Sequence, residues 1–387
     1  ENLTNCHSHG RGQGCPRCGP RGAAAVVAEV NRAIAEGVWR GQPQAHVIAW
    51  DWGWRNEWAE EVIAQLPREM WLMSVSEWDL PITRGGIESS VGEYSISAVG
   101  PGPRARRHWA AARRRGMRTA AKVQVNNTWE LSAVPYLPTL QLVAEHMSNL
   151  AEGGIEGLML SWTLGGYPSP NLEVAAQFYG EPHPTAQHAM WMVARRRFGE
   201  ACAPLVIAAW EQFSAALREF PFHIDVVYQA PQQFGPANLC HRGPTGYRAT
   251  MTGFPYDDLD GWRGIYPPEV FEAQFTKVAA GWRAGLEKLQ AACTVGAGAA
   301  IADELRVAEA AYLHFQSVAN QIAFVWARAE DWARCRELLR REIIVARRMF
   351  DLVNCDSRIG FEATNHYFYT RLDLVEKVVS CRYLLDM

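Results

Sequence analysis

Four short apolar runs, separated by helix-like segments, constrain the fold of the first 170 residues. The runs cover residues 45–50, 70–75, 120–125 and 157–162, and segments with helical apolar spacing cover 23–36, 57–66, 104–115 and 137–151. Strands that alternate with helices favour βα units and a parallel sheet, whose strands are apolar throughout because helices cover both faces. We therefore predict that the four runs are neighbouring parallel strands in chain order.

The second half of the chain has a different pattern. Residues 186–218 are helical with few breaks, and helix continues from residue 269 almost to the end, including a long amphipathic segment at 301–353. Between them, residues 220–268 are rich in Pro, Gly and aromatic residues, and a loop of this length is usually functional. We predict a parallel-sheet domain over 1–170, with a Cys-rich N-terminal loop, and a mostly helical domain over 171–387.

Each apolar run ends in aromatic, carboxylate or amide residues, in the stretches AWDWGW, SVSEWD, VQVNNTWE and MLSWTLGGYPSP. Four of the 16 tryptophans lie between residues 50 and 58. In a β/α barrel the active site is built from the loops at the C-terminal ends of the strands. The aromatic and polar residues at the ends of the four runs therefore predict one face of such a barrel. Trp52 and Trp54 are placed to stack on a sugar ring, and Asp51 to bind its hydroxyls or do chemistry.

Carboxylates at the strand ends are candidates for glycoside hydrolysis, which normally needs two carboxyl groups, about 5 to 5.5 Å apart in retaining enzymes and farther apart in inverting ones. The candidates are Glu1, Asp51, Glu77 and Glu130. For each, a salt bridge or a helix N-cap is the structural alternative. The candidate sugar-binding residues are Trp52, Trp54, Trp78, Asn126, Asn127, Trp129 and Trp162. Core packing is the alternative for the tryptophans, and a turn is the alternative for the asparagines.

A second chemical cluster lies in the stretch CHSHGRGQGCPRC near the start of the chain. Cys6, Cys15 and Cys18, with His7 or His9, offer three thiolates and one imidazole. Four such ligands make a closed structural zinc site, with no open position for a catalytic water. Only one Cys-x-x-Cys pair is present, so a disulfide and free thiols remain alternatives. No cofactor is expected for catalysis.

Composition excludes some functions. A net charge of -3 gives no general reason to expect nucleic acid. The arginine-rich stretch 104–118 is interpreted as the solvated face of a surface helix. No apolar run is long enough to cross a membrane. The chain begins at Glu1 without a signal peptide, so the compartment stays open, and a soluble, cytoplasmic protein is the expectation.

The motif order ENLTNC, CPRC, WDWGW, SEWD, VNNTWE and LSWTLGGYPSP is similar to the second half of a (β/α)8 glycoside hydrolase. It most resembles bacterial relatives of the family 20 and family 163 hexosaminidase barrels. The later pieces, GPTGYRATMTGFPYDDLDGWRGIYP and RIGFEATNHYFYTRLDLVEKVVSC, resemble the helical C-terminal region of the same proteins. The resemblance implies strands five to eight of the barrel, and the Asp-Glu pair typical of family 20 is not visible.

In many retaining barrels the acid/base follows the fourth strand and the nucleophile follows the seventh. The resemblance therefore implies Glu1 as acid/base and Glu130 as nucleophile, with Asp51 and Glu77 binding hydroxyls or tuning the pair. It implies a hydrolase that acts on a terminal sugar, and it favours a β-linked hexose or hexosamine. Four strands leave two open sheet edges, so we expect a homo-oligomer or a second chain that completes the barrel.

Two other functional classes compete with the hydrolase. One is a non-catalytic carbohydrate-binding or assembly protein derived from such a barrel. The other, less favoured, is a metal-dependent oxidoreductase that uses the Cys/His cluster. The spacing of the carboxylates separates the first two classes, because a close pair over an aromatic-walled pocket favours catalysis.

Overall fold

The computed structural model describes residues 14–161, 167–251, 253–296, 298–362 and 366–387. Its contacts divide the chain into two units, each made of several segments. Unit 1 comprises the described parts of 1–80, 100–123 and 149–160, and unit 2 comprises those of 81–99, 124–148 and 161–387. The division predicted at residue 170 stays a prediction.

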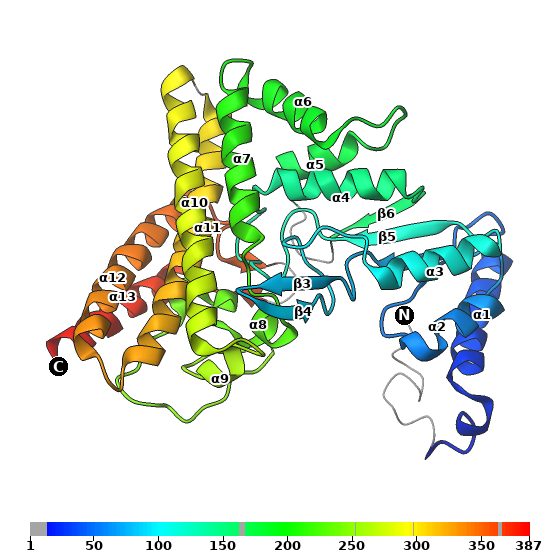
Figure 1. The fold of residues 1–387 in the computed structure, drawn as a ribbon, viewed down its shortest axis with the longest axis horizontal. Helices are drawn as coiled ribbons and strands as arrows, with labels where there is room; N and C mark the ends of the chain where they lie inside the picture. The colour runs from blue at the N-terminus through cyan, green and yellow to red at the C-terminus, as the bar shows by residue number, and fades with distance from the viewer. Residues whose placement is uncertain (1–13, 162–166, 252, 297, 363–365) are drawn as a thin grey trace. The chain divides into compact units, whose positions relative to one another are not determined.

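Unit 1 is built around a four-stranded parallel sheet (Figure 1). Its strands are β1 (Ile48–Trp50), β2 (Trp71–Val75), β5 (Thr119–Val123) and β6 (Gly157–Leu160), and their order is β1-β2-β5-β6. All three pairings are parallel. The predicted strands, their direction and their order are therefore confirmed, and the protein is a mixed α/β protein with many helices.

The helices of unit 1 follow the predicted apolar segments closely. They are α1 (Ala23–Gly41), α2 (Asn56–Gln65) and α3 (Pro103–Arg114), preceded by a short 3-10 helix, η2 (Gly19–Arg21). Helix α3 begins with Pro103 at its first position, where the missing N–H costs nothing. Its buried side faces the sheet, and the Trp109 indole N–H donates to the carbonyl oxygen of Ala120 at 3.1 Å. Arg104 belongs to that buried side, so the interpretation of all of 104–118 as a solvated face is wrong at this position.

Strand register decides which side chains share a face of the sheet. Trp50 pairs with Met73, Val75 with Lys122, and Lys122 with Met159. Because side chains alternate along a strand, these five residues project from one face, which we call the Lys122 face. Ala49, Leu72, Ser74 and Ala121 project from the opposite face, which we call the Ser74 face.

Unit 2 is mostly helical. Helix α4 (Leu140–Glu152) begins in unit 2 and ends in unit 1. The other helices are α5 (Pro170–Ala176), α6 (Ala186–Phe198), α7 (Ala203–Leu217), α8 (Ile224–Gln229), η3 (Pro231–Gln233), η4 (Gly235–Ala237), α9 (Leu259–Trp262), α10 (Pro268–Gly296), α11 (Ala299–Ala327), α12 (Trp332–Cys355) and α13 (Arg371–Asp386). Two antiparallel hairpins complete it: β3 (Pro81–Arg84) with β4 (Ile87–Ser90), and β7 (Phe361–Glu362) with β8 (His366–Tyr367).

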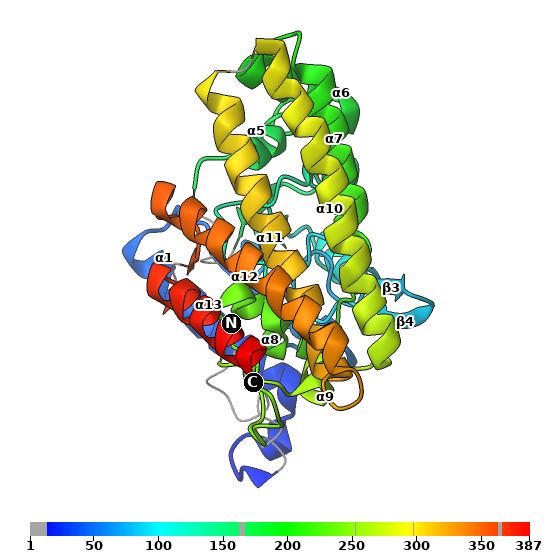
Figure 2. The same cartoon turned by 90° about the vertical axis from the view of Figure 1, so that its left-hand side faces the viewer.

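The long helices of unit 2 pack in pairs, α10 beside α11 and α12 beside α13 (Figure 2). The predicted amphipathic segment 301–353 is two helices, because the Asp331 side chain caps the start of α12 by accepting the N–H of Arg334. Helix α7 approaches α10 closely at Gly281 and Gly285, one turn apart on the same side of α10. A Cβ at Gly285 would lie 2.4 Å from the Phe213 ring, so only glycine permits this contact.

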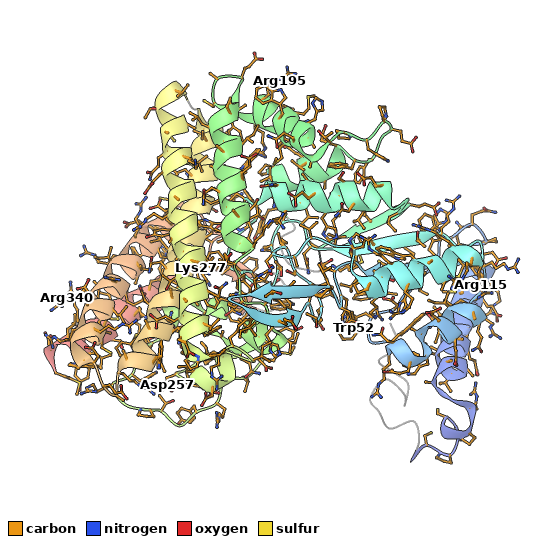
Figure 3. All side chains as sticks on the ribbon, viewed as in Figure 1. Trp52, Arg115, Arg195, Asp257, Lys277 and Arg340 are labelled. Carbon is orange, nitrogen blue, oxygen red and sulfur yellow. The ribbon has the colours of Figure 1, made fainter. Side chains whose placement is uncertain are left out.

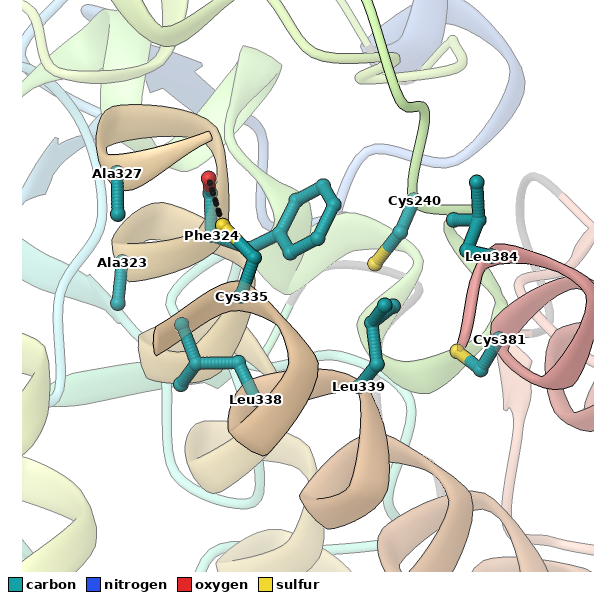
Figure 4. Packing of buried hydrophobic residues seen from close by; sticks show 9 residues of the cluster. All are labelled: Cys240, Ala323, Phe324, Ala327, Cys335, Leu338, Leu339, Cys381 and Leu384. Atoms are coloured by element: carbon teal, nitrogen blue, oxygen red, sulfur yellow. Dashed lines mark hydrogen bonds between the residues drawn. The ribbon is translucent and has the colours of Figure 1, made fainter. Parts of the chain in front are cut away.

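Buried cysteines contribute to the core of unit 2. Cys240, Cys335 and Cys381 lie in a cluster with Phe324 and Leu339 that joins α11, α12 and α13 (Figure 4). The Cys335 thiol donates to the carbonyl oxygen of Phe324 at 3.7 Å. A buried thiol behaves as a small apolar group, so these cysteines have a packing role. Among the described helices, none combines the length and the apolarity that crossing a bilayer requires.

Candidate functional site

A tight turn after β1 shapes the stretch Asp51–Trp54. The N–H of Trp54 donates to the carbonyl oxygen of Asp51 at 3.0 Å, and Gly53 adopts a φ of 77°, which favours glycine. The guanidinium of Arg104 donates to the carbonyl oxygens of Asp51 and Trp54 at 2.9 and 3.0 Å. The turn is therefore held from α3, and it leaves Trp52 only partly buried (Figure 3).

The Asp51 carboxylate is fully buried on the Ser74 face. It accepts a hydrogen bond from the Ser74 hydroxyl at 2.6 Å, lies 2.7 Å from Nδ1 of His108, and forms an ion pair with Arg104 at 3.1 Å. Burial alone would raise its pKa, but the charge of Arg104 and the contact with His108 outweigh burial and lower the pKa below its usual range. Through these contacts Asp51, which directly follows β1, links that strand to Ser74 of β2 and to α3. We call this role an anchor.

Glu77 and Lys122 lie near the C-terminal ends of β2 and β5. The N–H of Ser76 donates to the carbonyl oxygen of Lys122 at 3.1 Å, and Glu77 follows in the turn after β2, close enough to Lys122 for their charges to interact. Both side chains are fully buried. Burial lowers the pKa of Lys122 to about 8, and the negative charge of Glu77 opposes that shift. The charges of the Glu77 carboxylate and the Lys122 ammonium therefore interact at the C-terminal ends of neighbouring strands.

Aromatic rings extend along the same strand ends. The ring centroids of Trp50 and Trp52 are 6.0 Å apart, and those of Trp52 and Trp78 are 6.5 Å apart. The Arg104 guanidinium carbon lies 4.7 Å from the centroid of the Trp78 ring. This cation–π contact helps to hold the Trp78 ring in place. Trp52 and Trp78 are partly exposed, whereas Trp54 is buried. The first two can therefore present ring surface to a ligand, and Trp54 is a core residue.

Glu130 lies in unit 2, where its carboxylate holds a loop. It accepts hydrogen bonds from the Ser95 hydroxyl at 2.6 Å, the N–H of Ile96 at 2.8 Å and the N–H of Ser97 at 3.1 Å. Burial raises the pKa of Glu130, and these hydrogen bonds partly offset the shift. Both carboxylate oxygens are engaged by the loop, an arrangement that fits a positioning role at least as well as a nucleophilic one.

The predicted amides and Trp129 also make internal contacts in unit 2. The Asn126 side chain donates to the carbonyl oxygen of Tyr167 at 2.8 Å and accepts the Ser169 hydroxyl. Asn127 donates to the carbonyl oxygens of Ser132 and Val134. Trp129 is buried, with its ring 5.8 Å from that of Tyr228. Both asparagines thus stabilise loops, as paired asparagines in turns often do.

Several predicted residues fall outside the described part of the chain: Glu1, Cys6, His9 and Trp162. Of the proposed metal ligands, Cys15 and Cys18 are described, and the N–H of Cys18 donates to the Cys15 sulfur at 3.5 Å. The two cysteines therefore share one tight turn, as a pair that binds one ion requires. Within the described ranges, no three His, Cys, Asp or Glu side chains gather to hold a metal ion.

The predicted residues thus fall into two described sets. Unit 1 holds Asp51, Trp52, Trp54, Glu77 and Trp78, and unit 2 holds Asn126, Asn127, Trp129 and Glu130. The expected pairing of Glu130 with a second carboxylate across an aromatic pocket stays a prediction.

Sequence reasoning missed three residues that build the site of unit 1: Lys122, Arg104 and His108. Lys122 could have been found as the one charged residue in an apolar strand. Arg104 and His108 are one helical turn apart, so they share a helix face, but nothing in the sequence shows that Asp51 faces them.

Comparison with models of known protein families, with curated proteins and with solved structures gave no significant match.

Proposed function

We propose that this chain is a carbohydrate-active protein of the glycoside hydrolase type, with Glu77 at the reacting centre. The observation that carries the proposal is the burial of Glu77 and Lys122, whose charges interact, at strand ends that also carry Trp52 and Trp78. Burying an ammonium is costly, and ionisable groups with perturbed pKa values cluster at functional sites.

Each residue of the proposed site suits a different part in glycoside hydrolysis. The ammonium of Lys122 stabilises the anionic form of Glu77, so Glu77 suits the role of nucleophile, base or stabiliser of positive charge on a sugar. The ring surfaces of Trp52 and Trp78 suit the apolar face of a pyranose. Hydrolysis also needs a second carboxyl group, which protonates the leaving oxygen.

The same observations support two structural proposals. The consecutive parallel order of the four strands favours part of a (β/α)8 barrel, with further strands added at β1 and β6 by another copy or another chain. The turn at Cys15 and Cys18 favours a structural zinc ion with ligands such as Cys6 and His9. Metal analysis of the purified protein tests for zinc, and titration of the thiols separates a disulfide from free thiols.

The alternative is a carbohydrate-binding protein without turnover. One observation favours it: both oxygens of Glu130 are engaged by the loop at 95–97, and the Asp51 carboxylate is held by Arg104 and His108. Two of the four predicted carboxylates therefore have structural partners.

The test measures turnover of an aryl-glycoside panel and sugar binding by tryptophan fluorescence. We expect Glu77→Gln to lower kcat by roughly a hundredfold or more, because the charge that stabilises the transition state is lost, and to leave binding nearly intact. Glu61→Gln, an exposed carboxylate on α2, is the matched control and should behave as wild type.

The outcomes separate the two candidates. A wild-type rate in Glu77→Gln would remove Glu77 from the reaction. A wild-type protein that binds sugar but turns over no member of the panel would be a binding protein, and a protein that does neither would overturn the proposal.

A further inference from the structure

Unit 2 contains a cavity of about 650 Å³ that none of the residues discussed above lines. Aromatic rings form much of its wall: Phe234, Phe254, Tyr256 and Phe368. The Phe234 and Phe254 rings are stacked with centroids 4.8 Å apart, and Phe368 meets Phe234 edge-on at 5.9 Å. Phe234 and Phe368 are buried, whereas Phe254 is 59% exposed. A large aromatic side chain at the mouth of a cavity, with an exposed face, is available to a ligand.

The aromatic rings continue from the cavity onto the surface. The Tyr256 ring lies 6.0 Å from Phe254 and 5.1 Å from Tyr247, which is 65% exposed. Phe234, Phe254, Tyr256 and Tyr247 therefore form a continuous row, which we call the aromatic row. All four come from the stretch 220–268, which is not one long loop as predicted, because it contains the short helices α8, η3, η4 and α9.

The charges around the cavity select against anions. Asp373 and Glu376 of α13 line it, and no lysine or arginine does so among its described lining residues. Asp373 is held in place by accepting the N–H of Thr370 at 2.5 Å. Burial lowers the pKa of His241, a further lining residue, and so favours the neutral form of its ring.

The charge of the buried Lys377 is directed away from the cavity. The Lys377 ammonium ion-pairs with Glu342 at 3.0 Å and donates to the carbonyl oxygen of Asn238. Lys377 follows Glu376 directly in α13, but its charge is neutralised within the core and does not offset the two carboxylates of the cavity.

We propose that this cavity and the aromatic row bind an uncharged or amine-bearing oligosaccharide. A pyranose has a C–H-rich face that packs on aromatic rings and hydroxyl groups that donate to carboxylates, and the cavity supplies both kinds of partner. An amino group adds a favourable charge interaction with Asp373 and Glu376, and a uronic acid adds an unfavourable one. The volume lies within the range of ligand sites, roughly 300–1,000 Å³. The proposal does not depend on catalysis at Glu77.

The test uses the whole chain, residues 1–387, and trisaccharides of equal length: a neutral hexose trimer, a glucosamine trimer and a galacturonic acid trimer. Affinity is measured by calorimetry, and contacts are detected by saturation-transfer NMR. We expect the first two to bind and the third to bind at least about tenfold more weakly. Phe254→Ala should weaken binding about tenfold, because a large apolar contact surface is lost.

Two further variants complete the design. Glu376→Gln should lower the affinity for the glucosamine trimer relative to the affinity for the neutral trimer, because one negative charge at the cavity is lost. Tyr383→Ala, an exposed aromatic residue of α13 that does not line the cavity, should bind as wild type. Phe254 and Glu376 are exposed, so thermal melting should show that both variants fold.

Unchanged binding in Phe254→Ala, or equal affinity for the uronic acid trimer, would overturn the proposal. Binding that is lost in Glu77→Gln but kept in Phe254→Ala would assign the sugar to the strand-end site alone. Binding that is kept in Glu77→Gln but lost in Phe254→Ala would assign the sugar to the cavity, and turnover by Glu77→Gln alone would then test Glu77.

Discussion

The buried pair of Glu77 and Lys122 is the most unusual residue-level feature of unit 1. An unpaired ammonium in the interior costs several kcal/mol, and a buried ion pair recovers this cost only in part. The pKa of Lys122, lowered to about 8, shows that burial outweighs the attraction of Glu77. A well-packed apolar residue at this position would be at least as stabilising as the ion pair in many proteins.

The lowered pKa predicts a specific dependence of stability on pH. In the unfolded chain the lysine titrates at 10.5, and in the folded protein at about 8. Between these values the unfolded state binds more protons, so stability rises with pH across this window, and below pH 8 the full penalty remains. Relative to Lys122→Met, the wild type should gain roughly 3 kcal/mol in unfolding free energy between pH 7.5 and 10.5. Urea denaturation at several pH values measures this, and a difference that does not change with pH would contradict it.

At the scale of elements, α3 is attached to the sheet by polar contacts as well as apolar ones. Arg104 and His108 reach the Asp51 carboxylate, and Arg104 also binds the turn that presents Trp52. Two more arginines of α3, Arg107 and Arg114, contact Glu60 of α2, but at the exposed surface. The same helix thus carries a buried ion pair and exposed ones, which differ in how much solvent screens them.

This difference can be measured. Asp51→Asn leaves the Arg104 charge buried without its partner, and we expect a loss of about 3 to 5 kcal/mol in unfolding free energy. Glu60→Gln removes only the exposed pairs and should cost less than about 1 kcal/mol. Chemical denaturation of both variants gives the comparison. If Asp51→Asn instead keeps wild-type stability and loses turnover, Asp51 is a catalytic residue and not an anchor.

At the scale of the whole molecule, the described strands leave both edges of the sheet of unit 1 open. Strands β1 and β6 each pair on one side only within the described residues. Ile48 of β1 is 47% exposed and Met159 of β6 is 42% exposed. Exposed edge strands promote pairing with another chain, so these strands are where further strands would add.

We therefore expect the protein to associate through these edges, most simply as a symmetric oligomer. Light scattering after size exclusion should give a mass above that of one chain. Charged substitutions at the edges, Ile48→Lys and Met159→Lys, should shift the mass toward one chain, and Ile344→Lys, at an exposed site on α12, should not. A wild-type monomer across the accessible concentration range would refute the expectation.

Much of the fold could be predicted because its signals are local. Each strand is a short apolar run, each helix of unit 1 shows its own periodicity, and strands joined by helices pair in parallel in chain order. The break between α11 and α12 was missed because the signal is one residue: Asp331 begins a new helix where the apolar pattern continues on both sides.

The sequence by itself determined which side chains follow the strand ends, including Asp51, Glu77 and the tryptophans around them. Only the tertiary structure decided that Asp51 contacts Ser74 on one face of the sheet, and that Lys122, on the opposite face, accompanies Glu77. Side chains alternate with a period of two residues, so a shift of one position in where a strand begins reverses every side chain. The register depends on backbone pairing between residues that are far apart in the chain, and on the packing of α3 against one face. A single sequence contains the candidates for the site, but the partners that set their charge and orientation come from those distant contacts.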